Sequence, residues 1–193
     1  MPRNPVEPRR MELLTLEERL AQPRRCQEHW YALAGSLLRG KSVLDVGAGT
    51  GEGLAMLRAC GCDARGIDPL PAGEGVARFD VAQLADKTWD AVTCMDVIEH
   101  VEDDAGLLRE MLRVARDSVF ISTPLFTTMR PIGEFHVREY APPELAALLN
   151  GLTYQIWSIA EAQTGRERHV FSCDRLENRP HDIAWGIMVE VPR

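Results

Sequence analysis

No stretch of this sequence stays apolar over the roughly 20 residues that a helix needs to cross a bilayer. The Arg- and Pro-rich N-terminus lacks the apolar core of a secretory signal peptide, so we expect a cytoplasmic protein without a membrane segment. Basic residues are in the minority, with 22 Lys and Arg against 29 Asp and Glu among 193 residues. Because non-specific binding to nucleic acids needs a basic surface, we do not expect DNA as a partner.

Cysteine pairs of the C-x-x-C type, which many zinc sites use, are also missing. The five cysteines include one C-x-C pair, Cys60 and Cys62, and no further ligands follow at metal-site spacing. We therefore expect reduced thiols and no bound metal. The sequence contains no internal repeat and no low-complexity segment, and its length predicts one domain with an extension.

The first 40 residues differ in character from the rest of the chain. A Pro-rich tail comes first, and Thr15 with Glu18 forms the S/T-x-x-E pattern of a capped helix start. A second helix carries apolar residues at helical spacing and ends near Gly40. We therefore expect a tail and capping helices over residues 1–40 and one ligand-binding domain over residues 41–193.

Strands and helices alternate from residue 42 onward. Short β-branched or apolar runs predict strands over residues 42–46, 64–67, 76–79, 91–95, 119–122, 154–159 and 169–173. Apolar residues at helical spacing predict helices around residues 54–61, 107–115 and 143–150. This alternation predicts an α/β fold, with a Rossmann-like, doubly wound and mostly parallel sheet of about seven strands and helices on both faces.

Residues 35–42, GSLLRGKS, match the phosphate-binding pattern G-x-x-x-x-G-K-[ST] letter for letter. Such a loop binds phosphates only where it follows a strand and opens a helix. Here a helix precedes the match and a strand follows it. We therefore expect a helix end capped by glycine.

The informative glycine-rich loop lies in residues 43–53, VLDVGAGTGEG. It follows the first strand of the sheet, at the edge where open α/β sheets bind ligands. Gly47, Gly49 and Gly51 let the chain turn tightly and let a ligand approach the backbone. Turn geometry alone is the alternative explanation for these glycines.

The loop departs from the dinucleotide-binding pattern G-x-G-x-x-G. That pattern requires glycine at position 52 or 54, where this sequence has Glu52 and Leu54. The anionic Glu52 would also compete with a pyrophosphate for the positive end of the following helix. Asp68 closes the second strand, at a place from which an acid can bind a ribose diol. The site therefore suits an adenosine-like ligand with little phosphate.

These features resemble the class I S-adenosylmethionine-dependent methyltransferases over about residues 42–174. The resemblance rests on VLDVGAGTGEG at 43–53, GIDP at 66–69, FDV at 79–81, WDAVTCMDVIEHVEDD at 89–104 and SVFISTP at 118–124. IEHV at 98–101 and HVREYAPPEL at 136–145 are similar to the branch that methylates small molecules. The resemblance implies that residues 41–193 bind S-adenosylmethionine and transfer its methyl group to an oxygen, nitrogen or carbon atom of a small molecule.

By the same resemblance, ten residues are expected to hold the cofactor. They are Asp45, Gly47, Ala48, Gly49, Gly51, Asp68, Pro69, Asp80, Val81 and Met95. Asp68 would accept the ribose hydroxyls, Asp80 would bond the adenine amino group, and Asp45 would help to hold the amino group of the methionine part. The plainer alternatives are a turn-forming Asp68, a solvated loop acid at position 80, an Asp45 bonded to local backbone, and a core role for Met95.

Two histidines are the candidate catalytic residues. His100 follows the fourth strand, at the edge expected to carry the methyl group, and His136 lies in a segment able to close over it. Either imidazole can accept a proton from a hydroxyl acceptor, whereas an amine that binds neutral needs no base. Glu99, Arg138 and Tyr140 are expected to contact the substrate. The alternatives are a structural histidine at position 100 and a salt-linked, solvent-facing loop at positions 136 and 138.

Two other functions stay open for this sequence. One is an NAD(P)-dependent oxidoreductase on a related sheet, which the residues at positions 52 and 54 disfavour. The other is a methyltransferase-like module that binds a partner without catalysis. Fold analogy alone does not name the methyl acceptor.

Overall fold

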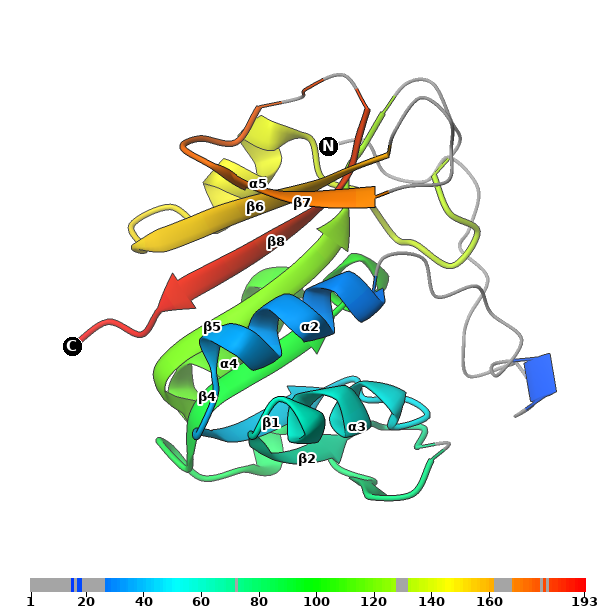
Figure 1. The fold of residues 1–193 in the computed structure, drawn as a ribbon, viewed down its shortest axis with the longest axis vertical. Coiled ribbons are helices and arrows are strands. Elements are labelled where there is room, and N and C mark those ends of the chain that lie inside the picture. The colour runs from blue at the N-terminus through cyan, green and yellow to red at the C-terminus, as the bar shows by residue number, and fades with distance from the viewer. Residues whose placement is uncertain are drawn as a thin grey trace.

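The computed structural model describes residues 15, 17–18, 27–71, 73–127, 132–161, 168–177, 179 and 181–193. Eight strands form a single sheet that carries helices on both faces (Figure 1). The elements follow in the order α2 (Gln27–Leu37), β1 (Ser42–Val46), α3 (Glu52–Ala59), β2 (Asp63–Ile67), β3 (Val76–Ala77), β4 (Trp89–Met95), α4 (Asp104–Val114), β5 (Ala115–Pro124), α5 (Pro142–Leu148), β6 (Tyr154–Glu161), β7 (Arg168–Cys173) and β8 (Asp182–Glu190). Short 3-10 turns at Val81–Gln83 and Ile98–His100 flank β4.

The strand order across the sheet is β3-β2-β1-β4-β5-β8-β6-β7. The first five strands pair in parallel, whereas β8 is antiparallel to both β5 and β6, and β7 is antiparallel to β6. The prediction of a Rossmann-like, mostly parallel sheet is thus confirmed. Because β1, β2 and β4 are parallel neighbours, the loops that follow them meet at one edge.

Strand β8 is missing from the sequence-based prediction. It lies between β5 and β6, with Ser118 opposite Glu190 and Pro124 opposite Ala184. Most of its residues are buried, so apolar and polar residues do not alternate along it. Gly186 interrupts the run because a Cβ there would lie 2.5 Å from the Trp30 ring of α2.

Two predicted boundaries are wrong. Ala115, expected on a helix, begins β5, because α4 runs directly into that strand. The third strand, expected over residues 76–79, ends at Ala77 as β3. Phe79 lies beyond its end and is exposed. The last predicted helix is confirmed: Pro143 lies in the first turn of α5, and Gly151 follows its end with a φ of +79°.

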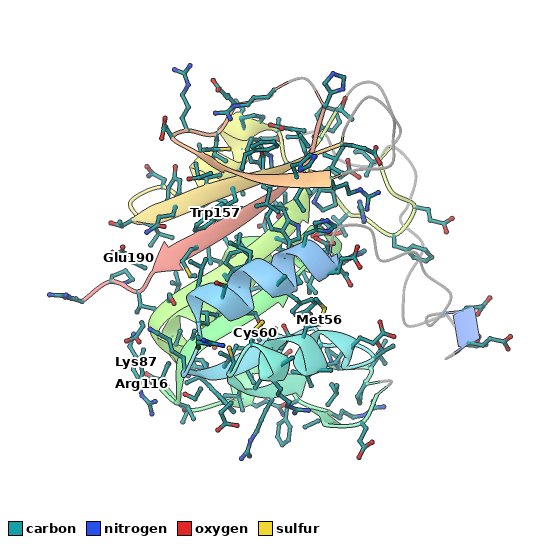
Figure 2. The ribbon with its side chains drawn as sticks, viewed as in Figure 1. Met56, Cys60, Lys87, Arg116, Trp157 and Glu190 are labelled. Atoms are coloured by element: carbon teal, nitrogen blue, oxygen red, sulfur yellow. The ribbon has the colours of Figure 1, made fainter. Side chains whose placement is uncertain are left out.

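Separate hydrophobic cores lie on the two faces of the sheet. Helices α2 and α3 pack over the face that carries Val43 and Phe120, and α4 and α5 cover the face that carries Leu44. Helices α2 and α3 also approach each other closely. A Cβ at Gly35 would lie 2.7 Å from the sulfur of Cys60, which Figure 2 labels at the end of α3.

The chain before residue 41 is described only in part. Thr15 and Glu18 form the expected capping box, because the Glu18 N–H donates to the Thr15 hydroxyl at 3.2 Å and the Thr15 N–H donates to Glu18 Oε2 at 2.8 Å. The predicted tail lies outside the described residues, and the boundary near residue 40 stays a prediction. Among the helices that the structure describes, none is long and apolar enough to cross a membrane.

The stretch that mimics a phosphate-binding loop is a helix end followed by a strand, as expected. Gly40 has a φ of +78°, the left-handed conformation that ends helices. The ammonium of Lys41 pairs with Asp117 at 2.7 Å. Figure 2 labels Lys87 and Arg116 at the same amino edge of β4 and β5, which is opposite to the glycine loop.

Candidate active site

The glycine loop between β1 and α3 adopts a backbone that favours glycine. Gly47, Gly49 and Gly51 have φ values of +76°, +52° and +80°. A Cβ at Gly47 would lie 2.5 Å from a Val97 methyl, and one at Gly51 would lie 3.0 Å from the Glu74 carbonyl oxygen. Among the described residues, nothing lies closer than 4.0 Å to a Cβ placed on Gly49. The centre of the loop is therefore bare, as a ligand resting on the backbone requires.

Asp68 joins the end of β2 to this loop. Its Oδ2 accepts a hydrogen bond from the Gly49 N–H at 2.9 Å, and its Oδ1 accepts one from the Leu70 N–H at 2.6 Å. The N–H groups of Gly47 and Ala48 donate to the last carbonyl of β2. The carboxylate thus lies beside the bare centre of the loop, where a ribose-binding acid is predicted, and it also has the turn-forming role that is the alternative.

Asp45 on β1 has partners that the sequence did not indicate. The Tyr31 hydroxyl donates to its Oδ2 at 2.9 Å, and the Thr93 hydroxyl donates to its Oδ1 at 2.7 Å. Burial raises the pKa of Asp45 to about 6, although both hydrogen bonds lower it. Tyr31 in turn packs on Gly53, where a Cβ would overlap its ring. Tyr31 and Thr93 carry no motif and lie 14 and 48 residues from Asp45 in the chain, so sequence reasoning missed them.

The residues predicted to lie near the adenine follow β3. Asp80 is exposed, and its Oδ1 accepts a hydrogen bond from the Ala82 N–H at 2.9 Å, which caps the short turn. Val81 is buried at the start of that turn, and Pro69 is exposed at the end of β2. Asp80 is therefore a solvent-exposed loop acid that caps a turn, as the alternative interpretation expected. Its hydrogen bond to the adenine stays a prediction.

Strand β4 ends in Met95 and Asp96. Met95 is buried in the core that α2 and α3 cover. It therefore has the core role that was the alternative to a cofactor contact. Asp96 has a φ of +52°, and its Oδ1 accepts a hydrogen bond from the Ser122 hydroxyl at 2.7 Å. Burial raises the pKa of Asp96 to about 6. Asp96 thus directly follows a buried strand and leads into the turn that carries Glu99 and His100.

The two catalytic candidates and Glu99 come together in space. The rings of His100 and His136 lie 4.9 Å apart, edge to face. One ligand atom from each of Glu99, His100 and His136 lies within 4.8 Å of the others. Glu99 and His100 belong to the turn after β4, whereas His136 belongs to the loop before α5. The Val137 N–H donates to the Glu99 carbonyl at 2.9 Å and joins the two segments.

Burial dominates the electrostatics of this cluster. It raises the pKa of the completely buried Glu99 well above its usual range. Burial and the neighbouring His136 lower the pKa of His100 to about 4, so the His100 ring is neutral at pH 7 and is a weak base. Nδ1 of His136 lies 2.8 Å from Oε1 of Glu139, a carboxyl group that is itself buried.

Arg138 and Tyr140, predicted to contact the substrate, are buried in a network around Asp104. The Arg138 guanidinium pairs with the Asp104 carboxylate and donates to the Glu102 carbonyl at 2.7 Å. The Tyr140 hydroxyl donates to Asp104 at 2.8 Å. These bonds hold the loop before α5 against the start of α4. Arg138 is salt-linked but does not face solvent, and Tyr140 is buried beside it. A substrate contact by either residue stays a prediction.

The residues at the glycine loop fit S-adenosylmethionine. The bare backbone at Gly49 has room for an extended ligand, and the adjacent Asp68 carboxylate can accept hydrogen bonds from a ribose diol. Residues 43–53 contain no Lys or Arg that would pair with a pyrophosphate, and Glu52 opens α3. An acidic loop without Lys or Arg therefore suits an adenosine whose tail is cationic and carries no phosphate.

The chain belongs to the methyltransferase-domain family, because residues 17–179 match the family model described as "Methyltransferase domain". It is similar to the ubiquinone biosynthesis O-methyltransferase of Xanthomonas oryzae pv. oryzae, with 27% identity over 165 residues, which covers 67% of this chain and 69% of that one. The enzyme of the same name from Aromatoleum aromaticum is 32% identical over 105 residues, or 45% of each chain.

Solved structures show the same fold at low sequence identity. An S-adenosylmethionine-dependent methyltransferase from Archaeoglobus fulgidus superposes with a TM-score of 0.67 at 19% identity, covering 90% of this chain and 97% of that one. The 1,6-didemethyltoxoflavin-N1-methyltransferase of Burkholderia thailandensis, solved with S-adenosylhomocysteine, gives a TM-score of 0.63 at 18% identity and covers 97% of this chain and 95% of that one.

The family membership confirms the predicted class of protein. The chain is an S-adenosylmethionine-dependent methyltransferase of class I. The alternative of an NAD(P)-dependent oxidoreductase is thereby set aside. The departure of the glycine loop from the dinucleotide pattern at Glu52 and Leu54 is consistent with this family.

Proposed function

We propose that this methyltransferase transfers the methyl group of S-adenosylmethionine to a hydroxyl oxygen of a small molecule. The observation that carries the proposal is the cluster of two imidazoles and Glu99 after β4, whose loop also contacts the glycine loop through Val97. A hydroxyl acceptor must lose a proton, so an imidazole that can act as a base at that place suits a hydroxyl better than an amine that binds neutral. The O-methyltransferase names of the sequence relatives support the same reaction class.

The proposed cofactor site uses the glycine loop and the ends of its neighbouring strands. Gly47, Ala48, Gly49 and Gly51 would line the methionine part, with Asp45 supporting them through its buried bonds. The remaining residues would contact the nucleoside or the sulfonium, namely Asp68 at the ribose, Pro69, Asp80 and Val81 at the adenine side, and Met95 beside the sulfonium. When bound, the cofactor supplies a methyl group that is already activated.

The protein's own part in the reaction is to hold the acceptor oxygen in line with the methyl group and to take up its proton. Positioning of this kind supplies about 7–11 kcal/mol in favourable cases. Of the two imidazoles, His136 is the stronger candidate for a base, because the buried Glu139 carboxyl lies at its Nδ1 and can stabilise the protonated ring. His100, with a pKa of about 4, would hold the acceptor hydroxyl without taking its proton.

A nitrogen acceptor is the second candidate. The solved neighbour from Burkholderia thailandensis is described as an N1-methyltransferase, and an amine that binds neutral needs no base. Both candidates are small molecules, in keeping with the acidic balance of the chain. A cytoplasmic location belongs to the same proposal.

Matched acceptors separate the two candidates. The purified protein is incubated with S-adenosylmethionine carrying a trideuterated methyl group and with 1,2-dihydroxybenzene, 2-aminophenol or 1,2-diaminobenzene, and the product masses and fragments are measured. We expect methyl ethers from the two acceptors with a hydroxyl and no product from the diamine. Methylation only at nitrogen would contradict the proposed oxygen acceptor.

A variant links the reaction to the cluster. We expect His136→Ala to lower turnover by about a hundredfold while the affinity for S-adenosylhomocysteine stays similar. His169→Ala, at an exposed histidine of β7, is the matched control and should keep full turnover. Full turnover in His136→Ala would mean that catalysis is by positioning alone.

A further inference from the structure

The two edges of the sheet differ in how open they are to a further strand. One edge is β3, which has only two residues, Val76 and Ala77. The other edge is β7, shown in orange in Figure 1, whose six residues pair with β6 alone among the described strands. Because a very short edge strand resists pairing with another chain, β7 is the edge that is long enough to accept one.

Strand β7 also lacks the other features that protect an edge. Its sequence, RHVFSC, contains no Lys and no Pro, and its register with β6 runs over all six residues without a bulge. Phe171 is 46% exposed although it lies within the strand, and the neighbouring Ser172 is exposed as well. A regular edge strand with an exposed aromatic ring is suited to pair with a further strand.

The charges at the two ends of β7 suit a second copy of the same strand. Arg168 begins the strand, and its guanidinium lies 3.4 Å from Oε1 of Glu161 on β6. Asp174 directly follows the strand and is exposed. Two β7 strands that pair antiparallel run in opposite directions, so Arg168 of each copy can lie opposite Asp174 of the other.

Symmetry and the alternation of side chains select one register. A two-fold axis normal to the sheet keeps each face of both copies on the same side, so residues opposite each other share a face. With Phe171 on the axis, the two Phe171 rings are neighbours, and Arg168 lies opposite Asp174 at both ends. An axis at Val170 would instead place Arg168 opposite Ser172. An axis at Ser172 would place Val170 opposite Asp174. Of these three registers, only the first pairs opposite charges, which stabilises a strand pair.

We propose that two copies of this chain associate through antiparallel pairing of their β7 strands, with Phe171 at the two-fold axis and Arg168 of each copy paired with Asp174 of the other. The two sheets then form one continuous sheet. Strands β4, β5, β8 and β6 separate β7 from β1, so the glycine loop lies outside the interface. Because one pair of short strands is a small contact, we expect a dissociation constant in the micromolar range.

Sedimentation velocity of the full chain over a series of micromolar concentrations tests the association. We expect the dimer fraction to rise with concentration. Phe171→Lys should weaken the association at least tenfold, because it sets two ammonium groups against each other at the axis. Leu37→Lys is the matched control, at an apolar residue of α2 that is 43% exposed, and it should associate as the wild type does.

A charge exchange tests the register. Arg168→Asp and Asp174→Arg should each weaken self-association at least tenfold, because like charges then meet at both ends. In an equimolar mixture of the two variants, opposite charges meet at both ends again, so native mass spectrometry should show a mixed dimer. The recovery in the mixture separates a lost contact from a lost fold, and circular dichroism confirms that each variant is folded.

Three results would contradict the pairing. A wild type that stays monomeric over the whole series would overturn it and leave this edge to a strand of a different protein. A dimer that Leu37→Lys dissociates and Phe171→Lys does not would lie on another surface. Folded charge variants that form no mixed dimer would exclude the register with Phe171 on the axis.

Discussion

Asp68 is the single residue on which the cofactor assignment depends most. Its carboxylate lies at the bare centre of the glycine loop and is held there by two backbone N–H groups. We expect Asp68→Ala to weaken S-adenosylhomocysteine binding at least tenfold, because a charge-assisted hydrogen bond contributes about 1.5–3 kcal/mol. Calorimetric titration measures this. Asp63→Ala, at the exposed start of the same strand, is the control and should leave the affinity unchanged.

Asp45 should make stability depend on pH. Its pKa is about 6 in the folded protein, above the usual 3.8, so the folded state binds the proton more tightly than the unfolded state. Stability therefore rises as the pH falls through 6 toward 3.8, by about 1 kcal/mol between pH 7 and pH 5 from this group alone. Urea unfolding of Asp45→Asn should show a pH dependence smaller by that amount. Equal pH dependence in both proteins would disprove the buried, high-pKa state of Asp45.

Some site residues could be predicted one by one and others could not. The three loop glycines and Asp68 follow a local strand–loop–helix pattern, so the sequence predicts their places in the loop after β1 and at the end of β2. The partners of Asp45 come from α2 and β4, and no local pattern marks them. Arg138 could be identified as a notable residue, but its burial against the start of α4 depends on long-range packing.

At the scale of elements, the contact between α2 and α3 depends on Gly53. Helix propensity alone predicts that Gly53→Ala stabilises α3 by about 1 kcal/mol. The structure predicts the opposite, because the new Cβ would overlap the Tyr31 ring and force α2 outward. We expect a loss of about 1–3 kcal/mol in the free energy of unfolding. In the Tyr31→Ala background, the same substitution should no longer destabilise the protein, as urea unfolding of the wild type, the two single variants and the double variant would show.

The amino edge of the sheet should be irrelevant to the cofactor. Lys41 lies in the match to a phosphate-binding loop, but its ammonium pairs with Asp117 where β1 begins. Since both side chains are partly exposed, Lys41→Ala should cost less than about 1 kcal/mol and leave cofactor affinity and turnover intact. Thermal melts should show no stabilisation by ATP. A stabilisation by ATP that disappears in this variant would contradict the helix-end assignment.

The missed and misplaced elements share a physical cause. Strand β8 lies between β5 and β6, where burial on both faces removes the alternation that reveals a strand. The direct passage from α4 into β5 leaves no turn residues to mark a boundary. The strands and helices that line the site, by contrast, end in glycine, proline or acid signals, so the functional half of the sheet could be predicted better than the other half.

At the scale of the whole molecule, the topology explains why the site lies where it does. The parallel order β2-β1-β4-β5 brings the glycine loop, Asp68 and the Glu99 cluster to one edge of the sheet. The loop before α5 adds His136 from a distant part of the chain. The sequence predicts this edge from the strand alternation and expects His136 in a segment able to close over it, whereas the contact between the His100 and His136 rings is seen only in the fold.

A crystal structure with S-adenosylhomocysteine tests the cofactor site most directly. We expect the ribose hydroxyls within hydrogen-bond distance of Asp68 and the homocysteine part on Gly47, Gly49 and Gly51. The sulfur should face the cluster of Glu99, His100 and His136 across the end of β4. A ligand bound elsewhere on the protein, or one whose ribose does not touch Asp68, would contradict the assignment.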